Sequence, residues 1–231
     1  FFRATIGGDF DMSSANISGG ISGNAFDTAT IYGNFDMNSA TISGGISGGA
    51  FSTAAIYGHF NMSSAAISSG INSAFVAAYI SGNFDMSSAT ISGGISDKAF
   101  YTGHIGGNFD MSSATISGGI TNYGLSRLLV NSNLLLTGTT FLDGGIQAYS
   151  FVGTNVAGFF NASGAGFPND TLPVQMLFGL QVAQGVDFSH CNLITLAQTR
   201  CANDGCVRMS DGDDDDVLDS FLNLQGGPFT G

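Results

Sequence analysis

Hydrophobic and polar residues alternate along this chain in short stretches and not in long runs. Segments of the types Phe-x-Met, Ala-x-Ile and Ile-x-Gly place successive side chains on opposite faces of a brief extended strand. Pairs of Gly or Ser interrupt these stretches where the chain must turn. The pattern therefore predicts many short β-strands that are joined by tight turns.

The pattern repeats about every 25 residues. The aromatic residue that opens the phrase FDMSSATISGGI, or a close variant of it, recurs in steps of 25, 25, 24 and 25 residues, at Phe10, Phe35, Phe60, Phe84 and Phe109. Columns in step with it hold Met12, Met37, Met62, Met86 and Met111, then Ile17, Ile42, Ile67, Ile91 and Ile116, and later in the unit Phe26, Phe51, Phe75 and Phe100. Repetition at a fixed period indicates one structural unit stacked on itself.

The repeat weakens after residue 130 without losing its period. Leu134 follows Phe109 by 25 residues, and Phe160 and Val186 continue the anchor in steps of 26. We therefore predict a solenoid over residues 1–196, with regular repeats over 6–130 and degenerate coils over 131–196. Residues 197–231 differ in composition and are expected to form an irregular C-terminal cap or tail with a Cys pair and an acidic run.

These observations predict the fold class. One coil cannot bury its apolar face alone, so neighbouring coils must supply the core. The expected fold is all-β: a single-stranded right-handed parallel β-helix (β-solenoid) of about eight coils of about 25 residues, with identical side chains stacked at roughly 4.8 Å. Eight such coils would give a rod roughly 35–40 Å long.

The amino-acid composition supports a fold of β-strands and excludes two classes of partner. Charged residues make up only 10% of the chain, against about 25% in ordinary domains, while 35 residues are Gly. The net charge of −12 comes entirely from Asp, and such a surface repels nucleic acid and anionic membranes. No apolar run reaches the roughly 18 residues that a membrane span needs. We therefore expect no nucleic-acid partner and no membrane span.

The phrase GNFDMSSATISGGIS resembles the GTFxMxGGTISGN repeats of large bacterial surface proteins. The resemblance covers about half of the chain strongly and residues 130–196 weakly. It implies a right-handed parallel β-helix with an adhesive or structural role, and it implies nothing more specific about function.

A second family, the pentapeptide-repeat proteins, is also similar. The stretch AFDTATIYGNFDMNSATISG can be divided into fives, and VDFSHCNLIT follows that family's rhythm. The square coil of these proteins is built from four such fives, which a period of 25 does not close. Ile21 and its equivalents also fall where that family points a polar residue outward. We therefore favour the larger β-helix.

A ladder of acidic residues follows the aromatic anchor, at Asp11, Asp36, Asn61, Asp85 and Asp110, and continues at Asn161 and Asp187. Stacked carboxylates repel each other, so bound cations would offset the charge, and Ca²⁺ suits hard oxygen ligands. The alternative, which we favour, is that these side chains satisfy backbone groups in turns. Calcium is a candidate ion and not a required cofactor.

The acidic tail is a second candidate metal site. Asp211, Asp213 and Asp215 have the 1-3-5 spacing of calcium loops, but the Gly at position six and the acidic residue at position twelve are missing. We interpret the run first as a solvated acidic tail.

Hydroxyl side chains form a candidate ligand face. Both polar residues of the Thr-Ile-Ser segments should point outward, at Thr41, Ser43, Thr90, Ser92, Thr115 and Ser117. Such arrays resemble ice-binding solenoids and could stack on carbohydrate. Ordinary strand surface is the simpler interpretation, and Ala66 in the middle of the array weakens the ice-binding hypothesis.

Three cysteines and four N-x-S/T sequons indicate the cellular compartment in which the protein is found. A Cys201–Cys206 disulfide that leaves Cys191 buried and free is the preferred arrangement, and it implies an oxidising, extracellular setting. Candidate glycosylation sites are Asn16, Asn61, Asn161 and Asn169. We expect a secreted or cell-surface protein.

We expect no enzymatic activity. Lyases with this fold use Arg or Lys beside acidic groups, but no two of the five cationic residues share a column in adjacent coils. Hydrolases need carboxylates clustered in a groove.

The chain enters the repeat almost directly after Phe1 and Phe2, so we expect another copy to cover the first coil. The sequence thus predicts a head-to-tail homopolymer: a subunit of a surface filament, sheath or adhesive appendage. The alternative is a monomeric carbohydrate-binding adhesin or ice-binding module.

Overall fold

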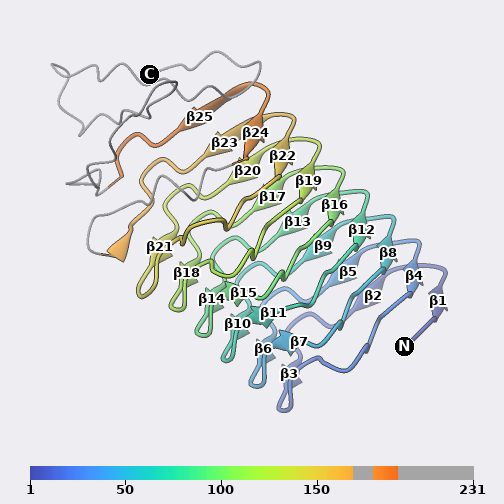
Figure 1. The fold of residues 1–231 in the computed structure, drawn as a ribbon. Helices are drawn as coiled ribbons and strands as arrows, with labels where there is room; N and C mark the ends of the chain where they lie inside the picture. Colours follow the sequence, from blue (N-terminus) through green and yellow to red (C-terminus); the bar gives the residue numbers. More distant parts are fainter. Residues whose placement is uncertain (169–178, 192–231) are drawn as a thin grey trace, which may run out of the picture.

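Each pass of the chain adds one short strand to each of several parallel sheets (Figure 1). The structure, a computed structural model, describes residues 1–168 and 179–191. In this part of the chain the coils stack into a β-solenoid of about seven turns with no helix, so the predicted all-β solenoid is confirmed. Right-handedness stays a prediction. The described residues hold no helix of the length and apolarity that a bilayer crossing requires.

Four sheets run along the rod. Sheet A contains β1 (Thr5–Ile6), β4 (Thr30–Ile31), β8 (Ala55–Ile56), β12 (Tyr79–Ile80), β16 (His104–Ile105), β19 (Leu129–Val130), β22 (Asn155–Val156) and β24 (Gln181–Val182). Sheet B contains β2 (Phe10–Asp11), β5 (Phe35–Asp36), β9 (Phe60–Asn61), β13 (Phe84–Asp85), β17 (Phe109–Asp110), β20 (Leu134–Leu135), β23 (Phe159–Asn161) and β25 (Gly185–Asp187). Sheet C contains β3 (Asn16–Ile17), β6 (Thr41–Ile42), β10 (Ala66–Ile67), β14 (Thr90–Ile91), β18 (Thr115–Ile116) and β21 (Thr140–Phe141). Sheet D contains β7 (Ile46–Ser47), β11 (Ile71–Asn72) and β15 (Ile95–Ser96).

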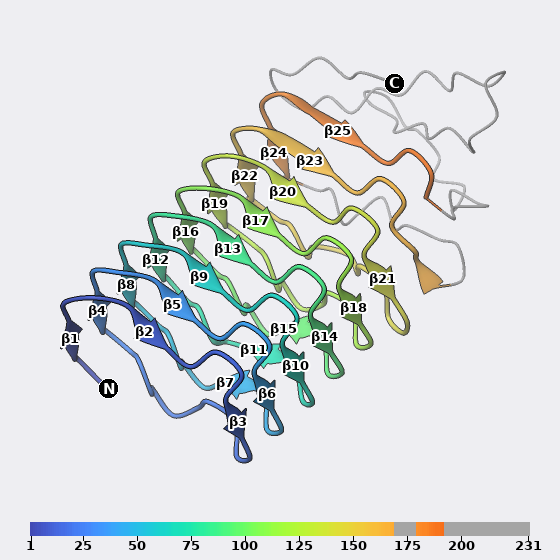
Figure 2. The same ribbon diagram turned by 180° about the vertical axis from the view of Figure 1, so that it is seen from behind.

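Strand pairing follows the 25-residue period. Phe35 pairs with Phe60, and Phe84 pairs with Phe109 in the same column. Between sheet D and the next strand of sheet A each coil consists of turns, and we call this the turn side of the coil. The turns also form hydrogen bonds to the next coil: the backbone N–H of Phe51 donates to the Ala74 carbonyl at 2.8 Å. Figure 2 shows the coils in register from behind. The column order that the sequence predicts is therefore the order of the stack.

Two columns of phenylalanine rings fill the centre of the rod. One comes from sheet B and the other from the turn side of the coil. Along a column the rings stack, with Phe60 and Phe84 centroids 4.9 Å apart. Between columns they meet edge to face, as Phe75 and Phe84 do at 5.1 Å and 88°. These rings are fully buried and adopt the two arrangements that aromatic pairs prefer, so each coil is packed by its neighbours.

The corners need residues that tolerate a left-handed backbone. Gly94 has φ of 80°, and a Cβ there would lie 2.7 Å from the Gly118 carbonyl carbon of the next coil. Glycine is required here both for its conformation and for this close approach. Another corner places a serine, such as Ser88 with φ of 58°, in the left-handed region.

Candidate functional site

The outer face of sheet B carries two parallel rows of polar side chains. The row after each inward-facing aromatic is the predicted ladder, and we call its members Asp11, Asp36, Asn61, Asp85 and Asp110 the carboxylate row. The row before each aromatic, which we call the amide row, contains Asp9, Asn34, His59, Asn83, Asn108 and Asn133. Because side chains two residues apart on a strand share a face, both rows point away from the core.

The carboxylate row caps turns. In each coil the side-chain oxygen accepts a hydrogen bond from the backbone N–H two residues later: Asp36 from Asn38, Asp85 from Ser87, each at 2.8 Å. Asn61 forms the same turn with Ser63 at 3.0 Å and also donates to Asp36 at 3.2 Å. The structure therefore shows the turn-satisfying role that the sequence favoured.

Hydrogen bonding also lowers the pKa of one member of this row. The Ser13 side chain and then the Ser13 backbone N–H hold the pKa of Asp11 below its usual value. This carboxyl is fully exposed, so hydrogen bonds and not burial set the direction of the shift.

The amide row binds successive coils to each other, a role that the sequence pattern did not reveal. The side chain of each member accepts a hydrogen bond from a backbone N–H of the next coil, at 2.7 to 3.0 Å. His59 replaces an amide in this row, and its Nδ1 accepts from the backbone N–H of Asn83 at 2.9 Å. The sequence does contain a pattern that could have identified this row: Asn, Asp or His directly precedes the inward-facing residue of six successive sheet B strands.

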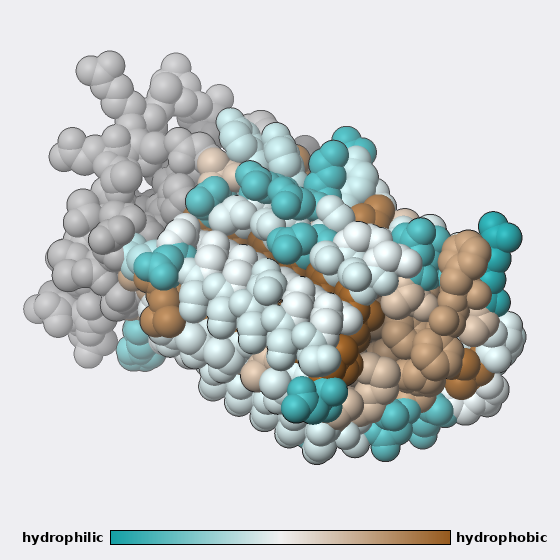
Figure 3. All heavy atoms as spheres, turned by 90° about the horizontal axis from the view of Figure 1, so that it is seen from below, coloured by the Kyte–Doolittle hydropathy of each residue, from teal (hydrophilic) through white to brown (hydrophobic). Residues whose placement is uncertain are grey.

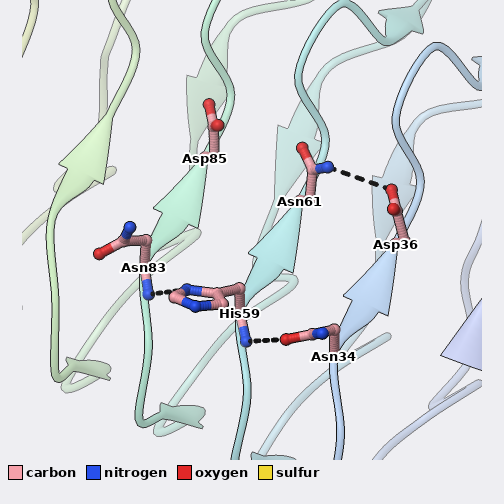
Figure 4. A pocket seen from close by; sticks show the side chains of 6 residues that line it. All are labelled: Asn34, Asp36, His59, Asn61, Asn83 and Asp85. Carbon is pink, nitrogen blue, oxygen red and sulfur yellow. Dashed lines mark hydrogen bonds between the residues drawn. The ribbon is translucent and has the colours of Figure 1, made fainter. Parts of the chain in front are cut away.

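A shallow, open depression of about 300 Å³ lies between the two rows (Figure 4). It is lined by Asn34, Asp36, His59, Asn61, Asn83 and Asp85, and we call it the polar groove. These side chains come from the three successive strands β5, β9 and β13 and their preceding residues. The groove is therefore a repeated feature of the stack and not the result of an inserted loop.

Cation binding stays a prediction. Within residues 1–168 and 179–191, no three His, Cys, Asp or Glu side chains come together in a way that could hold a metal ion. One oxygen of each aspartate in the carboxylate row is already engaged by a turn, as for Asp85 and Asp110. Asp211, Asp213 and Asp215 lie outside the described residues.

The predicted Thr-x-Ser face is present on sheet C. Thr41 and Ser43 are exposed on either side of buried Ile42, and Thr90 and Ser92 flank buried Ile91 in the same way. Thr115 and Ser117 are partly exposed. The row also continues at Thr140, a residue outside the predicted set, which pairs with Thr115. Ala66 interrupts the hydroxyls between Thr41 and Thr90, as expected.

The outer side of the first coil is apolar, and no described residue covers it. Figure 3 shows hydrophobic residues gathered at the end of the rod away from the grey residues. Phe1 and Phe2 are 64% and 53% exposed. The ring of Phe1 stacks on Phe26 with 5.0 Å between centroids and 1° between planes, so it continues the turn-side column by one ring.

Cysteine and sequon predictions divide between described and undescribed residues. Cys191 is free and packs against the core in the Ala column, as predicted, but it is half-buried and not fully buried, and its thiol donates to the Ala162 carbonyl at 3.0 Å. Burial raises its pKa to about 11. Cys201, Cys206 and Asn169 lie outside the described residues. Among the other sequons Asn16 is exposed, whereas Asn61 and Asn161 use their side-chain oxygens in turns.

Two cationic side chains gather around one tyrosine. Lys98 and Arg127 lie over the Tyr101 ring, at 5.2 Å and 5.4 Å from its centroid. They occupy different columns of the repeat, but adjacent coils still bring them to the same ring.

Comparison with known proteins adds no relative: no protein-family model matches the chain, and neither a curated protein nor a solved structure matches it.

Proposed function

We propose that this chain is an extracellular, non-enzymatic structural protein that builds a surface filament, sheath or adhesive appendage. In this proposal the solenoid of one copy stacks on the first coil of the next. The single observation that carries it is the apolar side of the first coil, which none of the described residues covers. A head-to-tail contact of this kind is heterologous, so it does not close and generates a filament.

The first coil differs from all coils inside the stack. Phe10, Met12 and Ile17 are only partly buried, whereas their column neighbours Phe35, Met37 and Ile42 are fully buried. The same side chains would lose their remaining exposure if one more coil covered them. Burying apolar area stabilises an interface by roughly 25 cal/mol per Å² before the cost of association is subtracted.

Backbone groups at this end favour a partner with the same repeat. Strands β1, β2 and β3 each pair on one side only among the described residues. An unpaired strand edge is a template for a further strand. At the other end of the rod, β24 and β25 also pair on one side only among the described residues, so a second copy could pair these edges of sheets A and B with β1 and β2.

Glycines at the open end make the proposal testable. The equivalents of Gly8 and Gly19 in later coils would direct a Cβ into the preceding coil: at Gly33 it would lie 2.3 Å from Asp9 Oδ1, and at Gly44 2.4 Å from the Gly19 carbonyl oxygen. At Gly8 and Gly19 themselves a Cβ meets nothing within 4 Å. A methyl group there would leave the fold intact and would obstruct only an added coil.

The experiment compares the Gly8→Ala/Gly19→Ala double variant with Gly7→Ala. Gly7 also has open space around it, but its column continues with the outward-facing Tyr32 and Tyr57, so a methyl there lies on the side of the rod. We expect filaments by electron microscopy near neutral pH for the wild type and Gly7→Ala, and separate particles for the double variant. Adding a calcium chelator to the wild-type protein tests whether calcium contributes to filament formation. Separate particles for all three proteins would refute end-to-end stacking.

A second candidate function is supported by the Thr-x-Ser face. Its exposed hydroxyls lie in register across neighbouring strands of sheet C, as Thr90 and Thr115 do. A regular flat array suits ice or carbohydrate as a ligand of a monomeric module. Thermal hysteresis, or carbohydrate binding that a Thr90→Val substitution abolishes, would support this candidate.

A further inference from the structure

The polar groove offers hydrogen-bond donors along one side. In the amide row, the acceptor atom of each side chain is occupied by the next coil, as Asn34 Oδ1 is by the His59 N–H at 2.8 Å. The side-chain N–H₂ groups of Asn34 and Asn83 have no hydrogen-bond partner among the described residues. Because His59 Nδ1 is an acceptor, the proton of the neutral ring resides on Nε2, so His59, which also lines the groove, carries a third donor.

The other side of the groove offers acceptors. Asp36 and Asp85 each use Oδ1 in a turn, and the second carboxylate oxygen of each has no hydrogen-bond partner in the described part of the chain. Two residues along a strand separate the rows by about 6.6 Å. The groove therefore presents a line of donors opposite a line of acceptors.

This arrangement distinguishes between classes of ligand. A hydroxyl group both donates and accepts, so neighbouring hydroxyls of a sugar can use both rows at once. An anion would meet the two carboxylates of the groove in a chain of net charge −12. A lone metal ion would find only two carboxylates, on either side of Asn61, and would leave the amide row unused.

We infer that the outer face of sheet B binds a neutral saccharide chain that lies along the rod axis, with its hydroxyls donating to the carboxylate row and accepting from the amide row. Donors and acceptors face each other from β5 to β17, which spans roughly 14 Å at the spacing between strands, whereas Asp9 before β2 offers acceptors only. At β20 the polar column is interrupted, because Leu135 pairs with Asp110, and it resumes at Asn161. This site is separate from the Thr-x-Ser face on sheet C, and it does not depend on end-to-end stacking.

The chain itself supplies a conservative test variant. Asn61 occupies the carboxylate row and forms the same turn as the aspartates, so Asp36→Asn and Asp85→Asn are expected to keep the turns. The double variant removes the charged acceptors from the groove. Asp97→Asn is the matched control, because Asp97 is an exposed aspartate on the turn side of the coil, away from sheet B.

Binding is measured by isothermal titration calorimetry of the full chain with cellohexaose, xylohexaose and mannohexaose, and with hexagalacturonate as the anionic comparison. We expect at least one neutral hexasaccharide to bind and to shift the ring NMR signals of His59. The Asp36→Asn/Asp85→Asn variant should bind at least tenfold more weakly with unchanged melting, and Asp97→Asn should bind as the wild type.

Three results would overturn the inference: no binding of any neutral hexasaccharide, equal binding by the double variant, or tighter binding of hexagalacturonate than of the neutral sugars. Binding that is lost in Thr90→Val and kept in the double variant would place the site on sheet C instead.

Discussion

The backbone N–H of Asn83 donates a hydrogen bond to Nδ1 of His59 in the preceding coil, at 2.9 Å. This bond is one link of a continuous row in which side chains of one coil hold the backbone of the next. His59 stands where the neighbouring coils have Asn34 and Asn83, so the row needs an acceptor atom and not a particular residue.

Substitutions of His59 should show whether stability depends on the acceptor atom or on the histidine itself. His59→Asn preserves the acceptor and should change the free energy of unfolding by less than about 0.5 kcal/mol. His59→Leu removes this exposed hydrogen bond and should lower the free energy of unfolding by about 0.5–1.5 kcal/mol, the net contribution of one hydrogen bond. Urea denaturation of both variants measures the difference, and equal stabilities would show that the bond contributes nothing.

Close approach of successive coils should make Gly93 intolerant of a side chain, although the same column accepts a serine at Ser69. A Cβ at Gly93 would lie 2.1 Å from the Ser69 carbonyl oxygen, so Gly93→Ala should destabilise the fold by about 2–3 kcal/mol. Gly19→Ala is the matched control, because it occupies the same column at the open end and meets nothing within 4 Å. Thermal melting should show a large loss for Gly93→Ala alone, and a comparable loss in both would argue against coil contact as the cause.

The carboxyl group of Asp11 should titrate with a pKa below its usual value of 3.8. Since its pKa is lowered in the folded chain, its contribution to stability is present above the unfolded value and is lost as the pH falls through the folded value. Ser13→Ala removes the largest cause and should raise the pKa of Asp11 toward 3.8, while the backbone hydrogen bond keeps part of the shift. A ¹³C NMR titration of the two proteins checks this, and identical titration curves would contradict it.

The thiol of Cys191 should be unreactive at pH 8. Burial raises its pKa to about 11 from a reference of 9.0, which lowers the thiolate fraction about 100-fold. In a Cys201→Ser/Cys206→Ser background, iodoacetamide should modify the folded chain at least about 100-fold more slowly than the urea-unfolded chain. Similar rates in the two states would mean that Cys191 is not packed against the core.

Much of the fold could be predicted from the spacing of single residues. The Phe, Met and Ile columns of the sequence are the buried columns of the structure, because parallel in-register stacking places equivalent residues of successive repeats on top of each other. For the same reason the Thr-x-Ser face and the inward position of Cys191 followed from their places in the repeat.

The sites were predicted less completely. Polar residues precede and follow each aromatic in the sequence, but only the row of Asp36 and its equivalents was predicted as a site, and its hydrogen bonds are local turns. The amide row depends on contacts about 25 residues apart, such as the one between Asn34 and His59, so no local rule identifies its role.

The sequence by itself determined the period, the inward and outward faces of each strand and the acidic charge, because these depend only on which residue occupies which place in the repeat. Only the tertiary structure decided which polar atoms remain unpaired. Whether Asn83 offers a donor or an acceptor, and whether Phe1 is covered, depends on the neighbouring coil, which supplies or withholds the partner. The open end and the polar groove therefore emerge only when the coils are stacked.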